Sequence, residues 1–151
     1  MSGDSDLIKL YSARILELAA DIPHHGRLPG PQASVKRRAP LCGSTVTVEL
    51  NCAADRVSDY AAEVKACALG QAAASVVGRN IIGCDLGQVS AARDALKEML
   101  KHDGPTPPAP FDGLEVLRPA RDYKNRHASI LLTLEAAVEA IETARAQTAC
   151  T

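Results

Sequence analysis

This sequence of 151 residues has few aromatic side chains, almost no net charge and no long apolar run. It contains no tryptophan, one phenylalanine and three tyrosines, so we expect a core built from aliphatic side chains. Its 17 basic and 18 acidic residues leave a formal net charge of −1, which provides no electrostatic footprint for nucleic acid. No apolar stretch approaches the length that crosses a bilayer, so we expect no membrane insertion.

Several features of known enzymes and exported proteins are also lacking. The first residues, 1–6, are acidic and polar, unlike a signal peptide, and we therefore expect a cytoplasmic protein. In that compartment an odd number of cysteines, five, is better explained by thiols than by a disulfide framework. We find no Ser/His/Asp set, no phosphate-binding glycine loop and no recognisable pair of carboxylates. The sequence therefore predicts a protein that is not an enzyme.

The size and the hydrophobic patterning predict one domain over residues 1–151, with 1–5 and 147–151 flexible. Three runs with strand character follow an N-terminal helix that Pro23 ends, and the rest of the chain is mostly helical. The strand candidates are Ala33–Arg37, Thr45–Asn51 and Arg56–Lys65. The helical candidates after them are Cys67–Val77, Gly87–Lys101 and Lys124–Ala146, and Phe111–Ala120 is expected to hold a short helix or an extended anchor. Strands followed by helices predict an α+β fold, a small antiparallel three-stranded sheet packed against four to five helices.

Three residues stand in settings that favour chemistry. Cys42 lies in the turn Pro40-Leu41-Cys42-Gly43, Cys67 follows a strand and begins a small-residue helix, and His127 opens the last helix. Two thiols and an imidazole that converge would form a site for a soft metal or an iron–sulfur cluster. Each also has a structural explanation, because cysteines often pack in cores and His127 could cap its helix or lie on the surface.

Four segments occur in an order that a known family shares. They are His24-His25-Gly26-Arg27-Leu28 after the first helix, Pro40-x-Cys42-Gly43, Cys67 before a stretch rich in alanine and serine, and His127-Ala128-Ser129-Ile130-Leu131. Together they resemble the iron–sulfur cluster assembly scaffolds of the IscU/SufU/NifU N-terminal type, whose last motif reads His-Cys-Ser-Ile-Leu. The long interval from Cys67 to Ala128 resembles the SufU branch.

The resemblance implies an IscU-like fold and a scaffold function. A cysteine desulfurase would supply sulfur, and iron or a labile [2Fe–2S] cluster would be held by Cys42, Cys67 and His127. The cargo would then pass to apo iron–sulfur client proteins. Zinc could occupy the same three ligands, and the protein would be a monomer or a weak homo-oligomer.

Two departures from the family pattern leave alternatives open. Ser44 replaces the family's aspartate, and Ala128 replaces the third cysteine, so two ligands are lost. A degenerate paralogue could instead act as a binding or regulatory module for the desulfurase or the Suf machinery. A third alternative is a zinc-dependent sulfur acceptor that uses Cys42 or Cys67. Among the other cysteines, Cys84 is the best candidate for a substitute third thiol.

Overall fold

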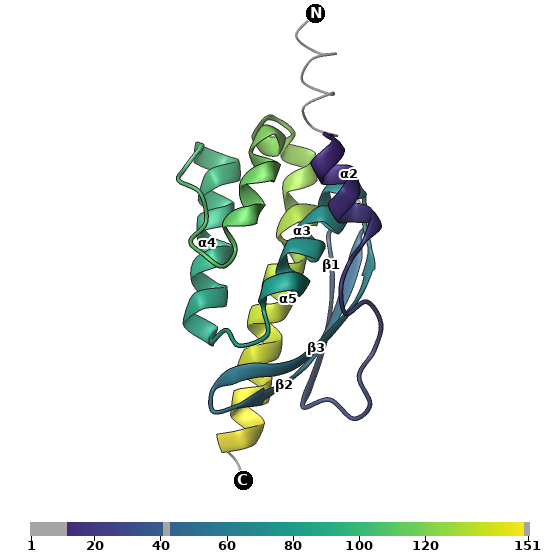
Figure 1. Cartoon of the computed structure of the whole chain (residues 1–151), viewed down its shortest axis with the longest axis vertical. Helices are drawn as coiled ribbons and strands as arrows, with labels where there is room; N and C mark the ends of the chain where they lie inside the picture. The colour runs from purple at the N-terminus through teal and green to yellow at the C-terminus, as the bar shows by residue number, and fades with distance from the viewer. Residues whose placement is uncertain (1–11, 41–42, 150–151) are drawn as a thin grey trace, which may run out of the picture.

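A sheet and a layer of helices make up the computed structural model, which describes residues 12–40 and 43–149 (Figure 1). In chain order the elements are α2 (Ala13–Ala20), β1 (Ala33–Arg38), β2 (Thr45–Ala53), β3 (Arg56–Lys65), α3 (Ala68–Asn80), α4 (Leu86–His102), the 3₁₀-helix η1 (Asp112–Asp122) and α5 (Lys124–Ala149). The α+β class and the three-stranded antiparallel sheet are confirmed.

The sheet has the order β1-β2-β3, with both pairs antiparallel. Its two longer strands are joined by the two residues Ala54 and Asp55, whose φ angles of 53° and 64° give the left-handed turn that suits the twist of a hairpin. Along β2 the side chains of Val46, Val48 and Leu50 are buried. This alternation gives the sheet one face for the core, as the period of two in the sequence predicted.

The helices cover that apolar face, and α5 is their common neighbour. It contacts β1, β2, α3, α4 and η1, and Figure 1 shows it running between α4 and the sheet. The buried side chains are almost all aliphatic, and Phe111 is the largest fully buried one. The expectation of an aliphatic core is therefore confirmed.

The helix boundaries differ from the expected ones in informative ways. The segment expected to be a short helix or an extended anchor is a 3₁₀-helix of 11 residues with Pro119 inside it. Asp85 caps α4 through a capping box with Gln88, which fixes the start of that helix. Of the expected N-terminal helix, residues 1–11 lie outside the described part. No helix within the described ranges is long and apolar enough to cross a membrane.

Candidate functional site

The strand register brings distant segments to one end of the sheet. Arg38 pairs with Thr45, and Thr45 pairs with Lys65, so the β1–β2 connection and the β3–α3 connection lie at the same end. Ser44 belongs to the first connection and Cys67 to the second. Cys42 also belongs to the first connection but lies outside the described residues, and its predicted role stays a prediction.

Cys67 is the N-cap residue of α3 and is half-buried. Its Sγ lies 3.6 Å from Oγ of Ser129, a residue that is only 1% exposed. Oγ of Ser129 lies 3.1 Å from Oγ of Ser44, which is also buried. Ser129 therefore contacts both the β1–β2 connection, through Ser44, and the β3–α3 connection, through Cys67. The sequence did not predict this role, although Ser129 belongs to the His127-Ala128-Ser129 motif.

Gly70 explains how α5 comes so close to the start of α3. A Cβ atom at this position would lie 2.5 Å from Oγ of Ser129 and 2.8 Å from Cβ of Ala66, both too short for a real contact. Because Gly70 has no side chain, α5 can pack close to the start of α3, and this brings Ser129 near Cys67.

His127 is buried, with 7% of its surface exposed, which excludes a surface position. Its Nε2 lies 3.0 Å from the carbonyl oxygen of Ala120 and 3.1 Å from that of Arg121. Carbonyl oxygens only accept hydrogen bonds, so Nε2 carries a proton and Nδ1 is the nitrogen that can bind a metal. Metal-binding histidines are commonly oriented in this way, by a hydrogen bond from the other ring nitrogen.

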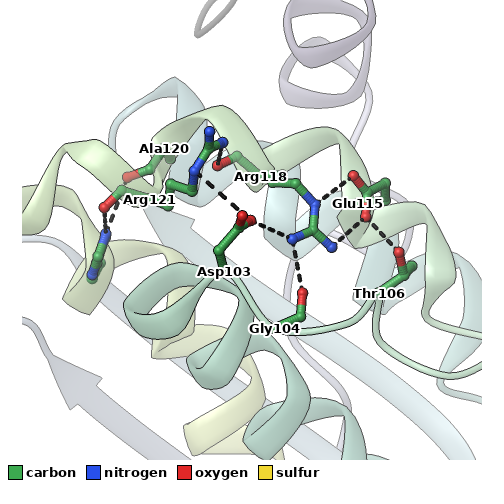
Figure 2. A network of polar contacts seen from close by, with 8 residues as sticks. Asp103, Gly104, Thr106, Glu115, Arg118, Ala120 and Arg121 are labelled. Atoms are coloured by element: carbon green, nitrogen blue, oxygen red, sulfur yellow. Dashed lines mark hydrogen bonds and ion pairs between the residues drawn. The ribbon is translucent and has the colours of Figure 1, made fainter.

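The carbonyls that hold His127 are themselves supported by a polar network (Figure 2). Arg118 donates to both carboxylate oxygens of Glu115, to Asp103 at 2.7 Å and to the carbonyl of Gly104 at 2.7 Å. The hydrogen bonds from Arg118 lower the pKa of Glu115. Because Asp103 and Gly104 follow α4, this network fixes η1 against the end of α4 and so fixes the partner of His127.

The predicted ligands do not all meet in the described residues. His127 and Ser129 are two positions apart on α5, about 200° around the helix axis, so their side chains leave it on different sides. The structure brings Cys67 together with Ser44 and Ser129, and it places His127 against η1, with Ala128 between them. Within 12–40 and 43–149, no three His, Cys, Asp or Glu side chains are close enough to hold a metal ion.

Cys84 does not fit the role of a substitute third thiol. It is only 3% exposed, its Sγ–H donates to the carbonyl of Asn80 at 3.2 Å, and burial raises its pKa. It follows the C-terminal end of α3, whereas Cys67 precedes the N-terminal end, and a helix of 13 residues is about 20 Å long. Cys84 is therefore better explained as a residue that packs in the core than as a metal ligand.

In the His24–Leu28 segment both histidines are exposed, but the backbone of the segment is attached to β3. The amide of Gly26 donates to the carbonyl of Ala62 at 2.9 Å, and the amide of Ala62 donates to the carbonyl of His24 at 3.0 Å. Nε2 of His25 accepts from the amide of Val64 at 3.4 Å. This loop therefore extends the sheet and is not a freely solvated turn.

A buried carboxylate on the outer face of the sheet holds the same loop. Glu49 accepts hydrogen bonds from Arg27 at 2.7 Å, from the amide of Leu28 at 2.9 Å and from Ser34 Oγ at 2.8 Å. Its side chain is 2% exposed, and the Arg27 hydrogen bond lowers its pKa to about 2. Sequence reasoning missed Glu49, because strand alternation places it on the face expected to be solvated.

Comparison with known proteins places this arrangement in one family. The family model described as the NifU-like N terminal domain matches residues 10–130. A crystal structure of a nitrogen-fixing NifU-like protein (N-terminal) from Brucella abortus is 45% identical, with a TM-score of 0.91, covering 94% of this chain and 99% of that one. At 20% identity, a putative iron–sulfur cluster assembly scaffold protein for the SUF system from Fervidobacterium islandicum AW-1 has the same fold, with a TM-score of 0.77 over 89% of this chain and 98% of that one.

The chain is also similar to a protein named as an iron–sulfur cluster assembly scaffold. The iron–sulfur cluster assembly scaffold protein IscU of Streptococcus pyogenes serotype M1 is 28% identical over 97 residues, which are 64% of this chain. The match spans about 60% of that relative's length. With the family match over residues 10–130, the chain belongs to the NifU-like N-terminal domain family of iron–sulfur cluster assembly scaffolds.

Proposed function

We propose that this protein is an iron–sulfur assembly scaffold that carries iron or a labile [2Fe–2S] cluster as cargo and passes it to apo-proteins. A cysteine desulfurase supplies the sulfur, and the protein itself catalyses no reaction. The observation that carries the proposal is the position of Cys67 at the start of α3, beside the His127-Ala128-Ser129 segment of α5. A thiolate is the form of cysteine that both binds metal and accepts sulfur.

The ligand set of this proposal is Cys42, Cys67 and His127. His127 would bind through Nδ1, because Nε2 is engaged by the carbonyls of Ala120 and Arg121. Cys67 would bind through Sγ, which borders Ser129. Cys42 is included in the ligand set only because of its sequence motif. Three protein ligands hold a cluster less firmly than four thiolates do, which suits cargo that must be released.

Cargo transfer tests this function, with variants that keep the fold. The protein is loaded anaerobically and mixed with an apo-ferredoxin, and cluster arrival is followed by visible circular dichroism. We expect Cys67→Ser to abolish transfer. We expect His127→Gln to reduce transfer strongly while the melting temperature changes little, because the glutamine amide can still donate to the carbonyls that His127 contacts.

The matched control for these variants is Cys84→Ser, which removes a thiol beyond the opposite end of α3 from Cys67. It should transfer its cargo as wild type does. Equal transfer by wild type and Cys67→Ser would contradict the proposal. Zinc content is measured in the same samples, because Cys and His ligands also suit tetrahedral zinc.

One observation favours a second function, that of a non-assembling paralogue that binds the desulfurase or its partners. Ser44 stands where the family has an aspartate, and it is buried against Ser129 at 3.1 Å, beside the Ala128 position that lacks a thiol. Such a protein would bind the desulfurase in a pull-down yet hold no stoichiometric iron, sulfide or zinc. Loss of desulfurase binding would contradict this second function.

A further inference from the structure

The sheet ends at β1, and the edge of this strand that faces away from β2 is open. Among the described residues, β2 is the only strand that pairs with β1. Apart from the β1–β2 ladder, no hydrogen bond from the described chain reaches a backbone group of residues 33–38. In an antiparallel pair every second residue turns its N–H and C=O groups toward the neighbouring strand, and the residues between turn theirs away. The outer edge of β1 can therefore accept one more strand.

A groove lies beside this edge, between β1, α4 and α5. It has two adjoining parts, with volumes of about 720 and 350 Å³. Both parts are lined by Arg37, Lys97, Leu131 and Glu135. Aliphatic side chains of α4 and α5 form part of the lining, namely Leu100, Leu131, Leu132 and Val138. A strand added to β1 would therefore have side chains of α4 and α5 beside it, some of them apolar.

The two ends of the groove differ in charge. Near the candidate site, four cationic side chains line the groove without an ion pair in the part of the chain that the structure describes: Arg38, Lys97, Lys101 and Lys124. At the far end, Glu139 and Asp94 pair with arginines at 2.8 and 3.0 Å. Glu135 and Glu142 have no ion pair within residues 12–40 and 43–149. The groove therefore favours a ligand that is acidic at one end and basic at the other.

These features together select an extended protein segment as the occupant. A small anion would use only the basic end and would leave the edge of β1 open. A second copy of β1 is opposed by charge, because its Lys36, Arg37 and Arg38 would lie close to the same residues of the first copy. β1 runs toward the candidate site, so a strand antiparallel to it starts at the basic end of the groove. Antiparallel pairing is also the more stable kind.

We propose that β1 and the groove bind an extended segment of a partner protein, which joins the sheet as a fourth strand antiparallel to β1. The first half of the segment is acidic and lies against the unpaired lysines. The second half is basic and lies against Glu135 and Glu142. Because His127 and Ala128 also line the basic end, the segment holds its protein beside the candidate site. This binding requires no cargo, so the inference can fail while the proposed function stands.

The test is the binding of synthetic peptides to the full-length, metal-free protein, measured by fluorescence anisotropy. The probe is a labelled peptide of threonine and valine, about nine residues or 30 Å long, with glutamates in its first half and lysines in its second half. The control peptide has the same residues in reverse order. We expect the probe to bind about fivefold more tightly than the control, the effect of two or three exposed ion pairs, and salt should reduce this difference.

Strand addition has a signature that charge attraction lacks. N-methylation of every second residue of the probe removes either the amide hydrogens that face β1 or those that face away, depending on which set is methylated. We expect one methylated probe to lose binding and the other to keep it. In the complex, the amides of residues 33–38 that lie outside the β1–β2 ladder should exchange their hydrogens more slowly, which nuclear magnetic resonance measures.

A pair of lysines on α4 tests the charge argument. Lys97→Gln/Lys101→Gln should lose the preference for the probe over the reversed peptide, whereas the control Arg14→Gln/Lys65→Gln should keep it. Arg14 and Lys65 are exposed and do not line the groove. These results, with binding that depends on which amides are methylated, would support the inference. Equal binding of the two peptides, equal effects of the two methylation patterns, or no binding at millimolar concentration would overturn it.

Discussion

Replacing Glu49 by glutamine removes a buried negative charge and should loosen the His24–Leu28 loop. Glu49 is 2% exposed and accepts three hydrogen bonds, from Arg27, from the amide of Leu28 and from Ser34. Glutamine has nearly the same shape but carries one donor group where Glu49 has only acceptors. One of the three donors would therefore face another donor, and the loop would lose its charged anchor.

The magnitude follows from the pKa of Glu49. The Arg27 hydrogen bond lowers this pKa from 4.5 to about 2, which corresponds to about 3 kcal/mol of stability at neutral pH at roughly 1.4 kcal/mol per pKa unit. The Arg27 side chain is 59% exposed, so solvent weakens the pair and a cost of about 2 kcal/mol is the better expectation. For a domain of this size that is a large part of the total stability.

The pH dependence gives the sharper test. Because the folded state lowers the pKa of Glu49, its contribution is complete above the unfolded value of 4.5 and is lost as the pH falls toward 2. Urea unfolding of wild type and Glu49→Gln at pH 7 and pH 3 measures the difference. The two proteins differ in their free energy of unfolding. We expect the part of this difference that comes from the Glu49 charge to be about half as large at pH 3 as at pH 7.

The control for this prediction is Glu63→Gln, which alters the other carboxylate that Arg27 contacts. Glu63 is 40% exposed, so its loss should cost no more than about 0.5 kcal/mol. An equal cost for both variants, or a Glu49→Gln cost that stays constant between pH 7 and pH 3, would refute the reasoning.

Three further changes test packing around the site by urea unfolding. Gly70→Ala should cost about 1–3 kcal/mol, because its Cβ would lie 2.5 Å from Ser129 Oγ, whereas Gly87→Ala, with 3.4 Å to its nearest neighbour, should be neutral or slightly stabilising. Cys84→Ala should destabilise by about 1 kcal/mol yet load iron like wild type; reduced loading would mean that the thiol is a ligand after all. Arg118→Gln should cost about 1–2 kcal/mol by detaching η1 from α4, and an unchanged stability would show that the network in Figure 2 contributes little.

The fold was largely predictable because its elements follow simple periodicities. The residue pattern in Thr45–Asn51 and in Arg56–Lys65 predicted two strands, and the short interval between these runs left room only for a tight turn. The residues of η1 were ambiguous, since Pro119 inside an apolar pattern argues against an α-helix but allows a 3₁₀-helix.

The candidate site was predictable in its residues but not in its contacts. The motifs identified Cys67 and His127, yet their partners Ser129 and Ala120 depend on how α5 packs against α3 and η1. Cys84 was a candidate third ligand only because it is a thiol. The sequence does not show that the length of α3 separates Cys84 from Cys67. Glu49 was overlooked for a similar reason: a strand pattern cannot show that a distant loop covers its outer face.

The measurement that tests the central claim most directly is the amount of iron and acid-labile sulfide per chain after anaerobic loading. Wild type and Cys67→Ser are loaded side by side. The account predicts near-stoichiometric iron and sulfide in wild type and neither in Cys67→Ser, with unchanged far-UV circular dichroism. Equal loading of the two folded proteins, or no loading of wild type, would contradict it.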